Sequence, residues 1–231
     1  MSKPEILTVA KLWPPYLEEL QQTYVVHDRT HELDAATFAQ IAPRIKAIAG
    51  GGESQVTRAL MSQLPALEMI SVFGVGYDRY DLAAARERGI PITNTPDVLT
   101  DDVADMGISL MLAIARTIPQ ADKYVREGKW PNGPMPLARK VTGARLGIVG
   151  LGRIGSAIAR RAAGFDMSIA YTSRNKVVDS PYAYYPTPAA LAAEVDFLMA
   201  PSTCACSSAY LPSRGPTALN CVVHTPLKAK G

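Results

Sequence analysis

Residues 145–155 read RLGIVGLGRIG, and this stretch decides the fold. Arg145–Val149 is a mostly apolar run of strand length, and glycine-rich sequence follows it at once. Apolar side chains then recur at helical spacing as far as Ala162, and Met167–Tyr171 supplies another apolar run. A strand, a tight turn, a helix and a second strand form a parallel βαβ unit, so the sequence predicts an α/β fold.

The three glycines of this turn have the spacing of a dinucleotide-binding loop. Gly150 lets the chain turn tightly off the strand, Gly152 leaves space for a pyrophosphate, and Gly155 lets the helix pack closely on the sheet. Unpaired amides at the start of the helix would face the phosphates. A plain strand-to-helix turn is the alternative. The residues assigned to the cofactor here are Gly150, Leu151, Gly152, Arg153, Ile154 and Gly155.

The end of the second strand favours NADP(H) as the dinucleotide. Proteins that prefer NAD usually place Asp or Glu there to bind the ribose 2′-hydroxyl. This chain has Thr172–Lys176, with no acidic residue before Asp179. Ser173 can donate a hydrogen bond to a 2′-phosphate and Arg174 can make a forked, charge-assisted contact with it. A solvated surface arginine is the alternative, and NAD(H) stays possible.

Composition excludes several classes of protein. Of the 231 residues, 48% are apolar and 19% charged, which is enough to bury a core. The net charge of +3 comes from three basic residues in 201–231, which has no acidic residue. The preceding 200 residues carry 21 basic and 21 acidic side chains. Because these residues carry no excess positive charge, the composition does not indicate a nucleic-acid partner.

The cysteines and apolar runs argue against secretion and membrane insertion. All three cysteines, Cys204, Cys206 and Cys221, lie near the end of the chain, so a disulfide framework is excluded. Their C-x-C spacing does not favour zinc, and no metal site is predicted. The most apolar segment, Met106–Ala115, has ten residues, whereas a membrane span needs about 20. With no signal peptide evident at the start, we expect a cytoplasmic protein.

The first hundred residues alternate between short apolar runs and helical patterns, which indicates a parallel sheet covered on both faces. We predict one flavodoxin-like α/β domain over residues 1–98. The expected strands are Ile6–Ala10, Tyr24–Val26, Ile45–Ala49, Met69–Phe73 and Ile90–Ile92. The expected helices lie around Tyr16–Gln22, Asp34–Ile41, Glu53–Leu60 and Asp81–Arg88, and His27 and His31 fall in an expected solvated loop.

A domain boundary is predicted near Leu99. Thr100 can cap a helix whose first turn holds three carboxylates, and the apolar residues that follow predict a helix buried nearly all round. Pro119 should end or bend it. Residues 99–200 are therefore predicted to form a Rossmann dinucleotide-binding domain of which only the first half is present, and 201–231 an atypical, poorly ordered tail.

Three stretches together resemble the D-2-hydroxyacid dehydrogenases, particularly the glyoxylate/hydroxypyruvate reductase branch. Phe73–Asp78 is similar to that family's substrate loop, Asn94–Asp105 to its crossing between domains, and Gly147–Gly155 to its cofactor loop. The resemblance covers about residues 1–200. It implies a two-domain oxidoreductase, usually a homodimer, that reduces a small 2-oxo acid such as glyoxylate or hydroxypyruvate by hydride transfer from the nicotinamide. The backbone amides of Val75 and Gly76 would hold the substrate carboxylate.

The chain departs from this family after Ala200. The family's catalytic Arg, Glu and His should lie well beyond that residue, but Arg214 and His224 follow too soon and no Glu separates them. We assign no catalytic residue, so the chain could be an inactive remnant left by truncation or a shifted reading frame. An active reductase with substitute residues and a non-catalytic NADP(H) sensor are the alternatives. The absent second half also predicts an unpaired, aggregation-prone edge strand near Phe197.

Overall fold

The computed structural model describes residues 3–201 and, for the backbone alone, residues 221–224. The chain divides into two compact units, Met1–Asp97 and Val98–Gly231. The sequence places the boundary near Leu99. Each unit has its own sheet and its own core.

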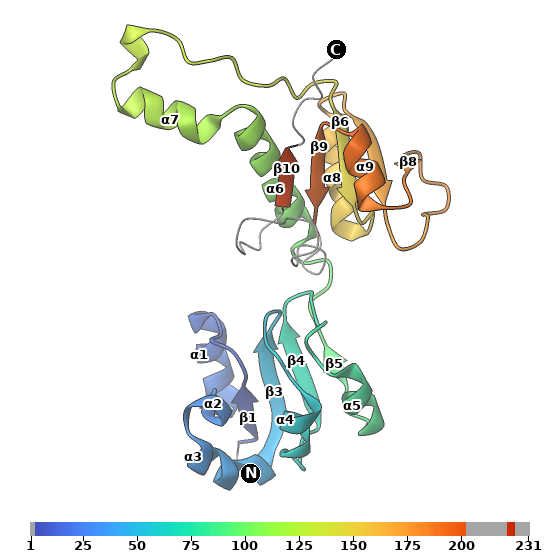
Figure 1. Cartoon of the computed structure of the whole chain (residues 1–231). Coiled ribbons are helices and arrows are strands. Elements are labelled where there is room, and N and C mark those ends of the chain that lie inside the picture. Colours follow the sequence, from blue (N-terminus) through green and yellow to red (C-terminus); the bar gives the residue numbers. More distant parts are fainter. Residues whose placement is uncertain (1–2, 202–220, 225–231) are drawn as a thin grey trace. The chain divides into compact units, whose positions relative to one another are not determined.

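The first unit contains a five-stranded, all-parallel sheet with the order β2-β1-β3-β4-β5 (Figure 1). This is the flavodoxin-like strand order, so the predicted fold class is confirmed. The strands are β1 (Glu5–Thr8), β2 (Val25–Asp28), β3 (Ile45–Gly51), β4 (Met69–Phe73) and β5 (Ile92–Thr93). The helices are α1 (Pro14–Thr23), α2 (Thr30–Leu33), α3 (Ala35–Ile41), α4 (Arg58–Ser62) and α5 (Leu82–Glu87), with a 3₁₀ turn at Ala42–Arg44.

Two local predictions for the first unit are wrong. The helix expected from Glu53 begins only at Arg58, because the hydroxyl of Thr57 accepts a hydrogen bond from the N–H of Leu60 at 3.2 Å and caps it there. The histidines are not in a solvated loop. His27 lies on β2 with its Nε2 2.8 Å from a carboxylate oxygen of Glu5. His31 lies on α2 with its side chain 13% exposed, and burial lowers its pKa.

The second unit contains the sheet β10-β9-β6-β7-β8. From β6 the chain steps outward through β7 and β8, then returns to place β9 on the other side of β6, with all four parallel. This reversal is the topological switch point of a Rossmann sheet, the position where dinucleotides bind. The strands are β6 (Arg145–Val149), β7 (Ser168–Thr172), β8 (Ala183–Tyr184), β9 (Phe197–Ala200) and β10 (Cys221–His224).

Helices cover both faces of this sheet. The side chain of Ile148 faces α8, whereas Gly147 faces Leu191 of α9. The guanidinium of Arg161 on α8 pairs with Asp101 and Asp105 and so fastens α6 to that helix. The helices are α6 (Thr100–Ala115), α7 (Ile118–Arg126), α8 (Arg153–Ala163) and α9 (Pro188–Glu194), with a 3₁₀ turn at Trp130–Asn132.

The predictions for α6 need correction. Thr100 is its first residue and not its cap, because Leu99 occupies that position without a side-chain hydrogen bond. Burial is also one-sided. Met111 is fully buried, whereas Met106 and Ile114 are 47% and 44% exposed. The helix ends at Ala115, and Pro119 lies in the first turn of the next helix, where a missing N–H costs nothing.

The predicted unpaired edge at Phe197 is wrong. β10 pairs antiparallel with β9 along its whole length, from Cys221 opposite Ala200 to His224 opposite Phe197. A strand of four residues with no helical crossover gives little sequence signal, which is why the pattern did not predict it. The other tail residues, including Arg214, lie outside the described residues.

Asp196 links β6 and β9, the two strands between which the strand order reverses. Its carboxylate accepts hydrogen bonds from the backbone N–H of Arg145 at 2.9 Å and from the side chains of Arg145 and Arg139 at 3.2 and 3.0 Å. The Arg145 contacts, foremost its side-chain hydrogen bond, hold the pKa of Asp196 below its usual range. The carboxylate therefore helps to set the register of β6 against β9.

This depressed pKa predicts a specific acid dependence. A carboxyl whose pKa is lower in the folded state contributes stability above its unfolded pKa of about 3.9, and loses it as the pH falls through the folded value. Thermal melts should show Asp196→Asn less stable than the unmodified chain at pH 7, with the difference shrinking below about pH 4. A difference that stays constant from pH 7 to pH 2 would contradict this role.

Candidate functional site

The glycine turn begins where β6 ends, at the switch point of the second sheet. Gly150 has φ +97°, a conformation that favours glycine, and its N–H donates to the Thr172 carbonyl at 2.7 Å. This hydrogen bond extends the pairing of β6 with β7 by one residue before the chain turns away from the sheet. Gly150 is required here by backbone geometry alone.

Gly155 allows α8 to approach β6. A Cβ built at this position would lie 2.0 Å from the backbone carbonyl oxygen of Gly150 and 3.2 Å from the side chain of Ile148. No side chain fits there without moving the turn or the helix. Gly155 is thus a packing glycine.

Gly155→Ala is expected to destabilise the second unit. The added methyl group meets backbone and not a flexible side chain, so the cost is about 3 kcal/mol, or a fall of roughly 10 °C in melting temperature. A thermal melt measures it. Gly152→Ala provides the matched control, since the same methyl group there should change the melting temperature little. Equal melting temperatures for the two variants would contradict the packing role of Gly155.

Gly152 has no structural reason to be glycine. Its φ of −85° suits any residue, and no heavy atom lies within 4 Å of a Cβ built on it. It occupies the N-cap position of α8, and the first backbone bond of that helix runs from Ser156 N to Gly152 O at 2.8 Å. The amides of Ile154 and Gly155 therefore have no intrahelical acceptor.

These features fit a pyrophosphate. Open space beside the turn leaves room for an anion. The neighbouring amides carry the partial positive charge of a helix N-terminus, which attracts it. The position after the central strand is also where a Rossmann sheet accommodates a dinucleotide. The six residues predicted for the cofactor are brought together on this one turn, which comprises Gly150, Leu151, Gly152, Arg153, Ile154 and Gly155.

Ser173 and Arg174 follow β7, the strand beside β6. The Ser173 hydroxyl donates to the Asn175 carbonyl at 2.5 Å, so its proton holds a local turn. Arg174 is exposed and makes no ion pair or hydrogen bond with any other residue that the structure describes. The guanidinium is free to bind an anion next to the glycine turn, whereas Ser173 would have to exchange its partner.

In the first unit, the predicted substrate loop follows β4. Gly74 has φ +152°, and a Cβ there would lie 3.1 Å from the backbone nitrogen of Gly52. Gly76 has no such constraint, because nothing lies within 4 Å of its built Cβ. Within residues 3–201, the N–H groups of Val75 and Gly76 donate to no protein acceptor. The loop thus presents two unpaired amides beside open space, an arrangement that binds carboxylates.

The sequence missed the residues that support this loop. Asn94 and Thr95 lie directly after β5 and hydrogen-bond to the loop's carbonyls, although the sequence placed them only in a crossing between domains. Tyr80 donates its hydroxyl to the Gly51 carbonyl at 2.8 Å, and burial raises its pKa. Ser54, 4% exposed, accepts from the Gly51 N–H at 2.8 Å. The contacts of Asn94, Thr95 and Tyr80 join segments far apart in sequence, so no local pattern reveals them.

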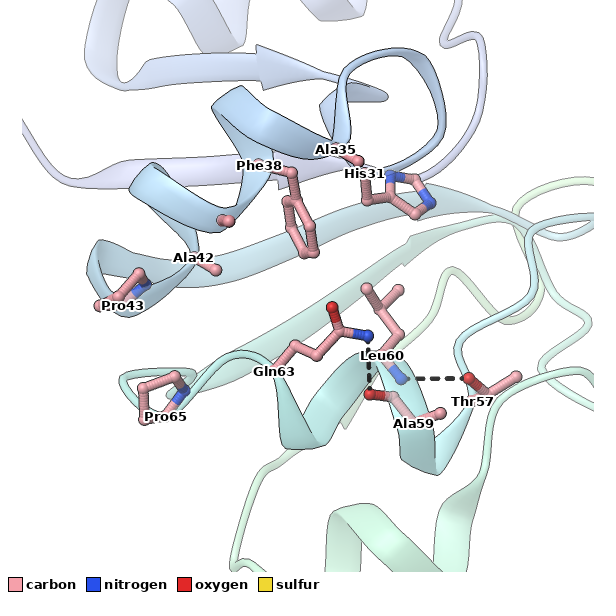
Figure 2. A pocket seen from close by; sticks show the side chains of 11 residues that line it. His31, Ala35, Phe38, Ala42, Pro43, Thr57, Ala59, Leu60, Gln63 and Pro65 are labelled. Carbon is pink, nitrogen blue, oxygen red and sulfur yellow. Dashed lines mark hydrogen bonds between the residues drawn. The ribbon is translucent and has the colours of Figure 1, made fainter.

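A shallow groove of about 610 Å³ lies between α3 and α4, and none of its lining residues belongs to either loop. Figure 2 shows Phe38 and Leu60 facing each other across it, with His31 at one end. Both apolar side chains are core residues, at 6% and 8% exposure. The Nδ1 of His31 has no hydrogen-bond partner but is itself buried. The other polar side chains that line it, Thr57 and Gln63, make hydrogen bonds to the backbone of Leu60 and Ala59. We therefore assign no ligand to this groove.

Two features of the described residues bear on other functions. No cluster of His, Cys, Asp or Glu suited to a metal ion occurs among them. None of their helices has the length and apolar character needed to cross a bilayer.

The two folds define an α/β protein whose second unit is of the Rossmann type and whose first unit carries a glycine loop with two unpaired amides. The model of the family "D-isomer specific 2-hydroxyacid dehydrogenase, catalytic domain" matches residues 6–191. The chain belongs to the D-isomer specific 2-hydroxyacid dehydrogenase family, as its motifs predict.

Individual relatives agree with this assignment. The chain is 40% identical to 2-ketogluconate reductase of Gluconobacter oxydans over 230 residues, which cover 100% of this chain and 70% of that protein. It resembles the structure of 2-hydroxyacid dehydrogenase from Ketogulonicigenium vulgare (TM-score 0.79, 48% identity, 87% of this chain and 64% of that one).

A third relative is NADPH-dependent glyoxylate/hydroxypyruvate reductase from Sinorhizobium meliloti, solved in complex with NADP and malonate. The TM-score is 0.76 and the identity 40%, covering 86% of this chain and 62% of that one. The chain thus spans about two thirds of the length of these proteins.

Proposed function

We propose that this chain binds NADP(H) at residues 150–155 and a small 2-oxo acid, such as glyoxylate or hydroxypyruvate, at Val75 and Gly76, as an oxidoreductase of the 2-hydroxyacid dehydrogenase type. One observation carries the proposal. In each loop, a glycine that neither backbone conformation nor packing requires, Gly152 or Gly76, leaves open space beside unpaired amides.

The dinucleotide, when bound, supplies the hydride that reduces the 2-oxo group. The chain's own residues bind the dinucleotide and the substrate and orient them. The start of α8 holds the pyrophosphate, and Arg174 pairs with the 2′-phosphate that distinguishes NADPH from NADH. The amides of Val75 and Gly76 hold the substrate carboxylate. The S. meliloti relative, which binds NADP and a dicarboxylate, supports both assignments.

The groups that polarise the substrate carbonyl and donate a proton are not assigned to any described residue. The family resemblance expects an Arg, a Glu and a His beyond Ala200, where the structure describes only Pro201 and the backbone of 221–224. This motivates the second candidate, a non-catalytic NADP(H) sensor on the same scaffold. Both candidates require the same cofactor site.

Two measurements on the purified chain separate the candidates. NADPH oxidation is followed at 340 nm with glyoxylate and with hydroxypyruvate, and NADPH binding is measured by calorimetry. Turnover with binding supports the reductase, and saturable binding without turnover supports the sensor. Absence of NADPH binding by a folded chain would refute both.

We also propose that the second unit pairs with a second copy of the chain. In Figure 1, α7 and the segment after it extend away from the sheet of their own unit. Leu137 on this segment is completely exposed. Folded monomers rarely display such a run of apolar side chains, and closed dimers are the commonest way to cover one. The exposed apolar residues here are Ile118, Val125, Trp130 and Leu137.

Leu137→Glu is expected to convert the dimer to a monomer, because it places a charge in the contact that the dimer would bury. Light scattering after size-exclusion chromatography should give twice the chain mass of 24.8 kDa for the unmodified protein and the single mass for the variant. Leu33→Glu is the control, since Leu33 is also exposed but belongs to the first unit. A monomeric unmodified chain would contradict the pairing.

A further inference from the structure

The two amides of the substrate loop owe their direction to the residues that follow β5. The side-chain Nδ2 of Asn94 donates to the carbonyl oxygen of Val75 at 3.0 Å. The backbone N–H of the next residue, Thr95, donates to the carbonyl oxygen of Gly74 at 2.9 Å. Two consecutive carbonyls of the loop are therefore held by two consecutive residues of another segment.

Peptide planarity converts these contacts into an orientation of the amides. In a trans peptide the C=O and the N–H that share the bond point in opposite directions, and the described chain has no cis peptide. The Val75 carbonyl shares its peptide with the N–H of Gly76, and the Gly74 carbonyl shares its peptide with the N–H of Val75. Both N–H groups consequently point away from Asn94 and Thr95, toward the same side of the loop.

The two supports differ in kind. The Thr95 contact is a backbone bond that lies beyond the end of the β4–β5 ladder, in which Ile70 and Ser71 pair with Ile92 and Thr93. Any residue with an N–H could make it. The Asn94 contact needs a side-chain donor of fixed length. Asn94 is half-buried, so few other donors could reach the Val75 carbonyl.

We infer that Asn94 is a positioning residue for the carboxylate site, because it sets the orientation of the Gly76 N–H through the Val75 carbonyl. The resulting site favours ligands whose carboxylate can accept hydrogen bonds from both N–H groups at once. This inference rests on the proposed function, since it assumes that Val75 and Gly76 bind a carboxylate. It adds that the site depends on a side chain that itself touches no ligand.

Oxamate, an unreactive amide analogue of glyoxylate, provides a test that needs no turnover. In the full chain labelled with ¹⁵N, the amide signals of Val75 and Gly76 should shift saturably as oxamate is added. Asn94→Ala removes the donor and should weaken oxamate binding about tenfold, the effect of one lost hydrogen bond. Asn132→Ala is the matched control, because Asn132 lies in an exposed turn of the other unit.

The Asn94→Asp variant distinguishes a role as hydrogen-bond donor from a purely structural role. The ionised carboxylate has nearly the same shape but can donate nothing to the Val75 carbonyl, so binding should be weaker at pH 7. Near pH 4 the carboxyl group is partly protonated and can donate again, so part of the affinity should return. If Asn94→Ala does not fold, this nearly isosteric variant carries the test.

The possible results are distinct. Weaker oxamate binding in both variants, with partial recovery of Asn94→Asp in acid, supports the positioning role. Unchanged binding in both, with the two amides still shifting, would overturn that role and leave the carboxylate site intact. If the amides of the folded, unmodified chain do not respond to oxamate, the substrate site itself is wrong and this inference fails with it. NADPH binding, measured in parallel, reports on the other loop alone.

Discussion

Gly152→Val is expected to abolish measurable NADPH binding while leaving the fold intact. The valine side chain would fill the open space beside the first amides of α8, where the pyrophosphate is proposed to bind. At least two charge-assisted hydrogen bonds would be lost, each of about 1.5–3 kcal/mol, so the affinity should fall more than 100-fold. Calorimetric titration with NADPH measures this loss.

The melting temperature separates this effect from unfolding. The φ of −85° at Gly152 suits valine, and no neighbouring atom obstructs its Cβ. Only the modest preference for glycine over valine at an N-cap would be lost. Gly76→Val, in the other unit, is the matched control. This variant should weaken oxamate binding and leave NADPH binding unchanged. If Gly152→Val binds NADPH as the unmodified chain does, the cofactor site is misplaced.

Arg174→Asp is expected to reverse the preference for NADPH over NADH. The substitution removes a forked cation from a dianionic 2′-phosphate and replaces it with a carboxylate, which repels the phosphate and can accept a hydrogen bond from a free ribose 2′-hydroxyl. Loss of about 3 kcal/mol on the NADPH side corresponds to a change of about 100-fold in the ratio of dissociation constants. Titration with each dinucleotide gives that ratio.

Arg160→Asp is the control for the general effect of charge. Arg160 is exposed on α8 of the same unit, so its substitution changes the net charge equally without touching the end of β7. The ratio should stay near that of the unmodified chain. An unaltered ratio in Arg174→Asp would show that Arg174 does not read the 2′-phosphate.

Local sequence predicted the parts of this fold whose cause is local. A glycine turn between an apolar run and a helical pattern is complete within residues 145–162, so its geometry follows from its own chemistry. Gly150 takes the positive φ and Gly155 makes the close approach that their spacing implied. At the start of α9, Thr187 caps the helix and Pro188 follows it, which is the residue pattern typical of a helix N-terminus. The parallel direction of the strands followed from the alternation of strands and helices.

The missed features depend on contacts between distant segments. β10 is defined by pairing with β9, and Cys221–His224 has no strand signal strong enough to stand alone. Only the surroundings of α6 decide that Met106 stays exposed while Met111 is buried. The role of Asn94 depends on the Val75 carbonyl, 19 residues earlier. Such contacts become visible only in the folded chain.

The central claim is that the turn after β6 binds the pyrophosphate of NADP(H). A crystal structure of the chain grown with NADPH tests it most directly. It should show pyrophosphate oxygens within hydrogen-bond distance of the backbone N–H groups at the start of α8, and the 2′-phosphate beside Arg174. Electron density for the cofactor at any other place, or a turn without it at saturating NADPH, would contradict the claim.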